Sequence, residues 1–171
     1  GAQVVPCPVN GAGELIWDAF IERLGPRTRL VAMGHCSNAL GTVNPIERIV
    51  ETAHRAGVPV LRDGAQAIAR LPIDLDALGV DFYACSAHKA YGPTGFGALA
   101  VHGDRIEEMR PWHGGGDMIR TVAFEGSTWN DAPYKFEAGT PDMAGAVGFA
   151  AAYFPARRAA STDPVRALRF E

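Results

Sequence analysis

Short apolar runs along this chain alternate with stretches in which apolar residues recur at helical spacing. Residues 28–33 and 58–61 are mainly aliphatic, which is typical of strands buried on both faces of a sheet. Between them, Asn44 is placed to cap a helix, Pro45 suits its first turn, and Gly57 suits the position after its last turn. The pattern predicts a strand, a helix and a second strand in succession.

The helix between these two strands is predicted to be amphipathic. Its apolar positions recur every three or four residues and so share one side: Ile46, Ile49, Val50 and Ala53. The charged positions fall on the opposite side: Glu47, Arg48, Glu51 and Arg55. An earlier helix over about residues 14–24 follows the same logic, and its apolar side consists of Ile16, Ala19, Phe20 and Leu24.

Two further apolar runs, residues 81–85 and 98–101, continue the alternation. Parallel strands joined by helices require right-handed crossovers, so the predicted fold class is α/β, with a mostly parallel sheet flanked by helices. In such sheets ligands bind beyond the carboxyl ends of the strands. The pattern places Asn38, Asp63 and the loop 86–89 at that edge.

Composition excludes several classes of protein. The chain has 171 residues, 47% of them apolar and 20% charged, which suits one soluble domain with its own core. No apolar run approaches the length of a membrane span and the N-terminus lacks a secretory signal, so we expect a cytoplasmic protein with no membrane partner. A net charge of −3, with clustered arginines only in the last 17 residues, argues against nucleic-acid binding.

A lysine and an aspartate have the residue types and positions that a pyridoxal phosphate site requires. Lys89 follows the strand predicted over 81–85, and Asp63 ends an apolar run. The cofactor needs an amine for its Schiff base and a carboxylate that keeps its pyridine nitrogen protonated. Taken singly, each residue has an alternative interpretation. The lysine could be a solvated surface group, and the aspartate could cap a helix.

Other kinds of site fit the sequence less well. The glycines of residues 92–97 match neither the dinucleotide fingerprint nor a P-loop, and a tight connection into the strand 98–101 is favoured over direct phosphate contact. Three widely spaced cysteines, Cys7, Cys36 and Cys85, argue against a disulfide framework and for reduced thiols. A zinc site made of His35, Cys36, Cys85 and His88 lacks a second closely spaced pair of ligands.

Five motifs in order resemble the class V aminotransferase family, and within it the cysteine desulfurases of the SufS and CsdA type, also described as selenocysteine lyase-like. The resemblance covers about residues 1 to 150. Its motifs are residues 35–41 (HCSNALG), 63–67 (DGAQA), 86–95 (SAHKAYGPTG), 114–119 (GGGDMI) and 136–141 (FEAGTP). It implies the large domain of a fold-type I pyridoxal phosphate enzyme.

The resemblance also implies roles for residues around the cofactor ring. Lys89 corresponds to the lysine that binds the cofactor and moves the α-proton of the substrate, and Asp63 to the partner of the ring nitrogen. Gln66 corresponds to the residue bonded to the ring oxygen, Ala65 to the residue packed against the ring, and Asn38 to a polar residue beside cofactor and substrate.

Three more residues are implied to bind the cofactor's phosphate. Ser86 and His88 match ligands of the same subunit, and Thr140 matches a threonine that reaches the phosphate held by the other subunit. A homodimer follows from the last match. No residue is assigned to a metal.

The chain also departs from the family. Family members are longer, and this chain resembles the middle of their large domain, so residues 1–154 are interpreted as part of that domain and residues 155–171 as a divergent tail. Pro155 is expected to break the helix that Met143, Val147 and Ala150 predict. None of the three cysteines matches the family's persulfide cysteine. The arginines of the tail are not assigned to the substrate carboxylate: Arg157, Arg158, Arg166 and Arg169.

Three functional hypotheses follow. The favoured one is a fragment of a cysteine desulfurase that converts L-cysteine to L-alanine and passes sulfur to an acceptor protein for iron–sulfur cluster assembly. The second keeps the cofactor but changes the reaction, to that of a selenocysteine lyase, an aminotransferase or an epimerase. The third is a truncated remnant without enzymatic activity, and turnover by the isolated segment is not expected.

Overall fold

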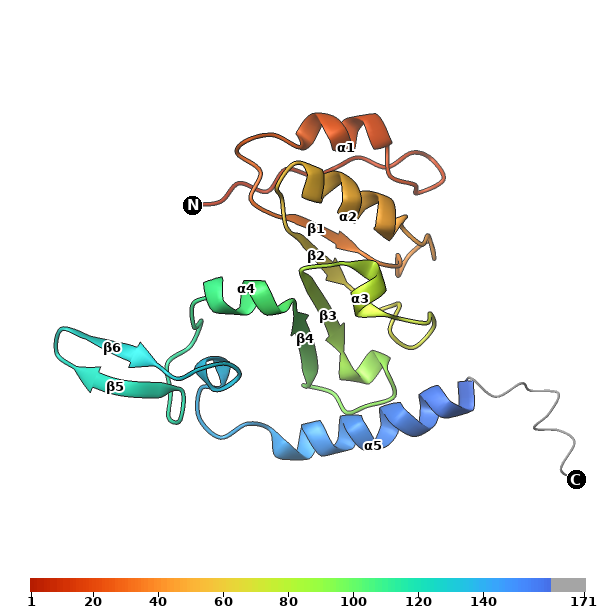
Figure 1. The fold of residues 1–171 in the computed structure, drawn as a ribbon. Helices are drawn as coiled ribbons and strands as arrows, with labels where there is room; N and C mark the ends of the chain where they lie inside the picture. The colour runs from red at the N-terminus through yellow and green to blue at the C-terminus, as the bar shows by residue number, and fades with distance from the viewer. Residues whose placement is uncertain (161–171) are drawn as a thin grey trace, which may run out of the picture.

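A four-stranded sheet forms the centre of the chain (Figure 1). The computed structural model describes residues 1–160, with side chains placed through residue 155. The first three strands are parallel, and the fourth runs antiparallel to the third. This confirms the predicted mostly parallel α/β fold. In their order across the sheet the strands are β1 (Val31–Gly34), β2 (Val60–Asp63), β3 (Phe82–Ser86) and β4 (Gly97–Val101).

The first two strands begin two or three residues later than predicted. Pro59 carries no N–H and accepts a hydrogen bond from Val31 N at 3.0 Å, so regular pairing starts at Val31 and Val60. Each strand correspondingly ends later, and Asp63 is the last residue of β2 rather than part of the following loop.

Three helices share one face of the sheet. Successive right-handed crossovers that move in one direction place their helices on the same side. The helices are α1 (Trp17–Arg23), α2 (Ile46–Arg55) and α3 (Leu75–Leu78). Figure 1 shows α1 lying beside α2, where the guanidinium carbon of Arg48 lies 3.7 Å from the centroid of the Trp17 ring.

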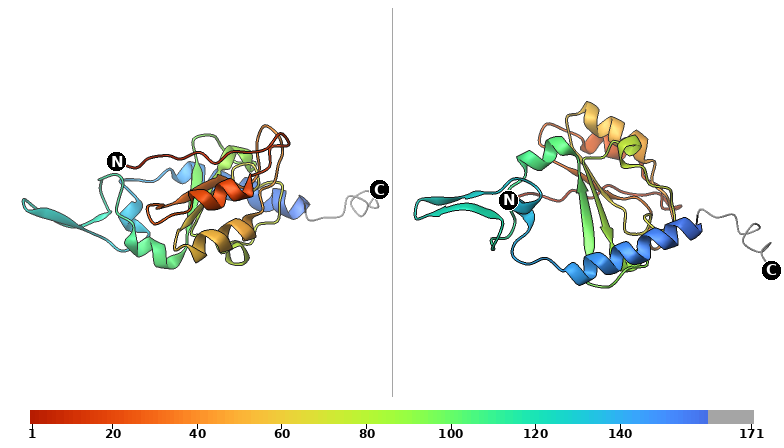
Figure 2. Two further views of the ribbon diagram at one scale, coloured as in Figure 1. Left: turned by 90° about the horizontal axis from the view of Figure 1, so that it is seen from above. Right: turned by 60° about the horizontal axis from the view of Figure 1, so that its bottom comes forward.

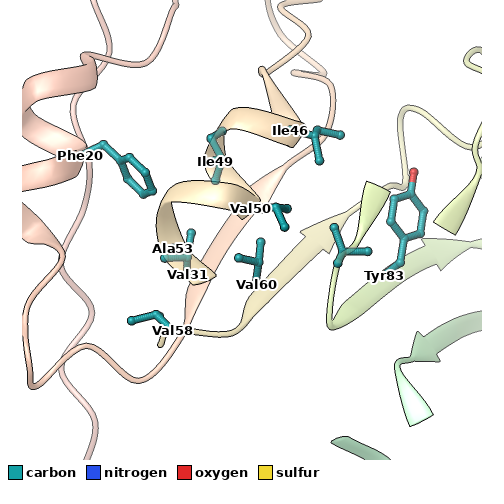
Figure 3. Close-up of a cluster of buried hydrophobic side chains, with 10 residues drawn as sticks. Phe20, Val31, Ile46, Ile49, Val50, Ala53, Val58, Val60 and Tyr83 are labelled. Atoms are coloured by element: carbon teal, nitrogen blue, oxygen red, sulfur yellow. The ribbon is translucent and has the colours of Figure 1, made fainter. Parts of the chain in front are cut away.

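The hydrophobic core lies between α2 and the sheet (Figure 3). All four residues predicted for the apolar side of α2 are buried, and the four predicted charged positions are exposed. They pack against Val31 of β1, Val60 of β2 and Tyr83 of β3, while Phe20 of α1 closes the cluster. Ile16 lies outside this core, because it precedes α1 and is 39% exposed.

The predicted cap of α2 is wrong. The residue at the N-cap is Pro45, and the side-chain amide of Asn44 instead donates to the carbonyl of Gly34 at 2.8 Å. Asn44 therefore ties the start of α2 to the end of β1. The predicted end of the helix is confirmed, because Gly57 follows the last turn with φ +69°.

After β4 the chain first leads away from the sheet, and the last described helix then returns to pack against residues 92–96. After β4 and the short helix α4 (Gly103–Glu108), a hairpin of β5 (Ile119–Ala123) and β6 (Gly126–Trp129) projects to one side, as the two views of Figure 2 show. The hairpin was not predicted. A 3-10 turn, η2 (Tyr134–Phe136), then leads to α5 (Met143–Ala160).

Helix α5 continues through Pro155, so the prediction that this proline ends the helix is wrong. A proline removes one N–H and crowds the carbonyl four residues earlier, here that of Ala151. Alanines on both sides, which have the highest helix propensity, allow the helix to continue. The side chains of Arg157 and Arg158, and residues 161–171 with Arg166 and Arg169, lie outside the part described.

Among the helices of residues 1–160, none combines the length and apolar character needed to cross a membrane. Cys7, Cys36 and Cys85 are free and half-buried. In the same part of the chain no group of three His, Cys, Asp or Glu side chains is gathered closely enough to hold a metal ion, so His35, Cys36, Cys85 and His88 do not form a cluster there.

Candidate active site

The predicted site residues other than Thr140 lie at the carboxyl edge of the three parallel strands. Asp63 is the last residue of β2, and Ser86 is the last residue of β3. His88 and Lys89 follow in the 3-10 turn η1 (Ala87–Lys89), and Asn38 lies in the loop that follows β1. Because the strands are parallel and adjacent, segments separated by up to fifty residues in sequence meet at one edge.

Hydrogen bonds fix the position of Asp63 on both sides. Its carbonyl accepts from His35 N at 2.8 Å, and the next residue, Gly64, donates to the carbonyl of Ala84 at 2.8 Å. The side chain is exposed, and its Oδ1 accepts from Ala65 N at 2.9 Å. Oδ2 has no hydrogen bond to any described residue, so it is available to a cationic N–H.

Lys89 is held by the buried alanines of its turn. Ala87 and Ala90 are fully buried, and the carbonyl of Ala87 accepts from both Ala90 N and Gly92 N at 2.8 Å. The Lys89 side chain is half-buried, and its amine makes no hydrogen bond or ion pair within residues 1–155. The other lysine of the chain, Lys135, is buried and lies 3.7 Å from the Glu107 carboxylate.

The glycines after Lys89 allow close packing, as the preferred interpretation of this segment predicted. A Cβ on Gly92 would lie 2.8 Å from the Phe149 ring of α5, and one on Gly97 would lie 2.7 Å from the carbonyl of Cys85. The segment is a tight connection between η1 and β4 that rests on α5.

The remaining predicted residues differ in their surroundings. Ala65 is buried, whereas Gln66 is half-buried and its Oε1 accepts from Arg70 Nη1 at 2.9 Å. Ser86 is half-buried and His88 and Asn38 are exposed, and none of the three side chains has a hydrogen bond within residues 1–155.

Thr140 is exposed in the loop before α5, and no hydrogen bond of the described residues joins it to the sheet edge. Its loop does meet the glycine motif 114–116. A Cβ on Gly115 would lie 2.8 Å from the backbone of Ala138, and Gly139 N donates to the carbonyl of Gly116 at 3.1 Å. The structure thus joins two motifs that are separated in the sequence.

Sequence reasoning missed a buried polar cluster under this edge. His35 Nδ1 lies 3.1 Å from the Tyr83 hydroxyl, and both side chains are buried. Arg62 lies beside Tyr83 on the neighbouring strand and is fully buried. The sequence pattern could have revealed the burial of Arg62, because alternation along β2 puts Arg62 on the same face as the core residue Val60.

Arg62 is a buried charge that has no hydrogen-bonding partner in the part of the chain that the structure describes. Its Nε, Nη1 and Nη2 atoms are buried and make no hydrogen bond among the described residues. Burial lowers the pKa of Arg62 to about 10, while Tyr83 and Glu47 raise it by less, so the guanidinium remains charged at neutral pH. An unpaired buried charge opposes folding.

Replacing Arg62 by methionine is therefore expected to stabilise the protein, by about 1–3 kcal/mol in the free energy of unfolding. Denaturant unfolding of the two proteins measures the difference. Arg55→Met is the matched control, because Arg55 is exposed on α2 and makes only a 3.8 Å pair with Glu51. A loss of stability in Arg62→Met would show that the guanidinium has a partner which offsets its burial.

Comparison with known proteins gives consistent matches. The family described as "Aminotransferase class-V" matches residues 1–157. A cysteine desulfurase of Klebsiella pneumoniae subsp. pneumoniae is 50% identical over 153 residues, which are 89% of this chain and 38% of that protein. The chain thus spans about two-fifths of the length of the curated relative.

Two solved structures resemble the fold. The cysteine desulfurase CsdA of Escherichia coli superposes with a TM-score of 0.84 at 42% identity, over 93% of this chain and 39% of that one. The cystine C-S lyase C-DES, in complex with its reaction product cysteine persulfide, gives a TM-score of 0.72 at 35% identity, over 82% of this chain and 39% of that one.

Proposed function

The chain belongs to the class V aminotransferase family, and from that premise we propose that it is the central part of the cofactor-binding domain of a pyridoxal phosphate-dependent cysteine desulfurase. One observation carries the proposal. Asp63 ends β2 and Lys89 follows the adjacent parallel strand β3, so both lie at one edge of the sheet. There, Lys89 Nζ and Asp63 Oδ2 have no hydrogen bond to any described residue. Residues 1–154 are proposed to belong to that domain.

The residues at the edge fit pyridoxal phosphate. The cofactor carries an aldehyde, a ring nitrogen that accepts a proton, a ring oxygen and a phosphate. The edge offers an amine from Lys89, a carboxylate oxygen from Asp63, and a hydroxyl and an imidazole from Ser86 and His88. The hydroxyl and a ring N–H are hydrogen-bond donors suited to a phosphate.

When bound, the cofactor would act as a sink for the electrons of a substrate carbanion. Asp63 would keep a negative charge at the ring nitrogen through Oδ2, because the Ala65 N–H occupies Oδ1 and holds the carboxylate in one rotamer. Gln66 would donate to the ring oxygen with its amide nitrogen, since its Oε1 already accepts from Arg70.

Lys89 would have two tasks. Its amine would attach the cofactor, and Nζ, once freed by the substrate, would take the proton from the substrate's α-carbon and return it. The fully buried Ala87 and Ala90 hold the backbone on both sides, so the amine moves only through its own side-chain torsions.

The proposed substrate is L-cysteine and the products are L-alanine and a sulfur atom passed to an acceptor thiol. The Cβ–S bond breaks, and the acceptor thiol becomes a persulfide. The relatives named cysteine desulfurase support this substrate, and so does the resemblance to a lyase crystallised with cysteine persulfide. No cysteine of this chain is assigned as the acceptor. We further propose that the sulfur serves iron–sulfur cluster assembly and that the protein is cytoplasmic. It would form a homodimer in which Thr140 reaches the partner's phosphate.

Covalent labelling tests the cofactor site. The complete polypeptide encoded by the gene is mixed with pyridoxal phosphate, reduced with borohydride, digested and mapped. Residues 1–171 contain two lysines, Lys89 and Lys135, so peptide mapping shows which of them carries the label. We expect the label on the peptide that contains Lys89; label confined to Lys135 or spread over surface amines would contradict the proposal.

A substrate assay then separates the reactions open to the family. L-cysteine with a thiol reductant should yield equal amounts of alanine and sulfide. Amino-group transfer to a keto acid, or racemisation without C–S cleavage, would indicate an aminotransferase or an epimerase. Faster turnover of selenocysteine would indicate a selenocysteine lyase.

A further inference from the structure

The turn that follows Asp63 rests directly on the ring of Tyr83. A Cβ added to Gly64 would overlap Cε1, Cζ and the hydroxyl oxygen of Tyr83, so the phenol fills the space that a side chain at Gly64 would take. Gly64 has no left-handed φ, and the requirement for glycine here is therefore one of space. Any movement of the Tyr83 ring changes the support beneath the Asp63–Gly64 peptide.

His35 fixes the other end of the phenol. The two rings meet edge to face with their centroids 6.0 Å apart, and His35 Nδ1 lies 3.1 Å from the Tyr83 hydroxyl. The backbone N–H of the same histidine donates to the carbonyl of Asp63. Contacts therefore run in a closed ring, from Asp63 to His35, to Tyr83, to Gly64 and back to Asp63. We call these four residues the brace.

Burial and nearby charges keep both rings of the brace in their neutral forms at neutral pH. Burial, and to a lesser extent the charge of Arg62, lower the pKa of His35, so the imidazole is neutral at neutral pH. Burial raises the pKa of Tyr83 to about 12, and the Asp63 carboxylate adds a smaller rise. Tyr83 thus keeps its proton at neutral pH, and the phenol and the neutral imidazole share one buried hydrogen bond.

We propose that Tyr83 and His35 are positioning residues, which act through the brace to set the Asp63 carboxylate for the ring nitrogen of the cofactor. The proposal rests on the proposed function, because it assigns a purpose to the position of Asp63. Neither side chain needs to touch the cofactor. The brace links the residue after β1, the end of β2 and the second residue of β3, so it ties together the three strands that supply the edge.

Tyr83→Phe tests the brace with little change in packing, because the ring remains and only the hydroxyl is lost. We expect the dissociation constant of pyridoxal phosphate to rise about three- to tenfold, the effect of one buried hydrogen bond. Titration of the apoprotein, followed by the absorbance of bound cofactor, measures it. Tyr134→Phe is the matched control, since Tyr134 is 58% exposed in η2, and its affinity should equal that of the parent.

Gly64→Ala tests the brace from the other side. The new Cβ displaces the Tyr83 ring. The affinity for pyridoxal phosphate should therefore fall, and it should fall further than in Tyr83→Phe. Because Gly64→Ala can fail to fold, the thermal unfolding of each apoprotein is recorded, and the Tyr83→Phe measurement stands on its own.

A double-mutant cycle separates positioning from general stability. If Tyr83 acts through Asp63, Tyr83→Phe should weaken binding in the parent and have little further effect in an Asp63→Asn background. Equal effects in both backgrounds, or no effect in the parent, would overturn the inference. Failure of the proposed function looks different: Lys89 would then carry no label in any of these proteins, including the parent.

Discussion

Lys89→Ala is expected to abolish covalent labelling by pyridoxal phosphate and to reduce desulfurase turnover of the complete polypeptide at least about 10³-fold. The amine is proposed to serve both as the attachment point and as the base at the α-carbon, so one substitution removes two steps. The fold should survive, because Lys89 is half-buried and contributes no hydrogen bond or ion pair within the described residues. Borohydride labelling and alanine formation are the two measurements.

Lys135→Arg is the matched control for this loss. Arginine keeps the positive charge near Glu107 but cannot attach the cofactor, so labelling and turnover should both remain at the parent level. Equal loss of labelling in Lys135→Arg, or unchanged labelling in Lys89→Ala, would show that Lys89 is not the attachment point.

Asp81→Ala is expected to destabilise the protein by about 2–4 kcal/mol. Asp81 lies just before β3, at the edge opposite the candidate site, and is buried. Its Oδ2 accepts from Val60 N at 2.7 Å and lies 2.8 Å from His54 Nε2, and its Oδ1 accepts from Arg105 Nε at 2.8 Å. One carboxylate therefore joins β2, α2 and α4, and its removal leaves the buried Val60 N–H unsatisfied. Denaturant unfolding measures the loss.

Asp104→Ala is the matched control for Asp81→Ala. Asp104 has a side chain that is 94% exposed and a single 3.8 Å contact with His102, so we expect a change below about 0.5 kcal/mol. Comparable destabilisation by both substitutions would show that the buried network around Asp81 contributes no more to stability than an exposed carboxylate does.

The same carboxylate predicts how stability depends on pH. Burial by itself raises the pKa of Asp81, but hydrogen bonds from His54, Val60 N–H and Arg105 outweigh burial and hold it below its ordinary value. A depressed folded-state pKa means that the stabilisation is fully present above the unfolded-state value of about 3.9 and is lost as pH falls through the folded-state value. Asp81→Asn should therefore lose less stability than the parent below about pH 4, as unfolding measured across that range would show.

The site was predictable as far as it depends on strand ends. Asp63, Ser86 and Lys89 follow apolar runs, and parallel strands bring such positions to one edge whatever the rest of the chain does. Roles of single residues came from the family resemblance, because an isolated serine or asparagine in a loop carries little information. The brace was missed because the close approach of Gly64 to Tyr83 joins residues nineteen positions apart, one just after β2 and the other in β3.

Local pattern also failed where a distant contact overrode a local preference. Asn44 has the residue type and position of a helix cap, yet its amide binds Gly34 on β1, a partner that exists only once the strand has formed. Pro155 has the residue type that breaks helices, yet α5 continues past it. For Asn44, propensity describes the isolated segment, and the folded chain offers a partner that the segment does not contain. At Pro155 the alanines on both sides favour the helix strongly enough for it to continue.

By itself the sequence determined the α/β class, the buried side of α2, the strand order along the chain and the edge at which Asp63 and Lys89 meet. These features depend on periodicity and on charge within short segments, where the physical cause and the pattern lie in the same residues. Only the tertiary structure decided the antiparallel direction of β4, the burial of Arg62, the Asp81 network and the brace beneath Asp63. Each of these depends on which distant segments come within a few ångströms of one another, and that distance is set by the packing of the whole domain.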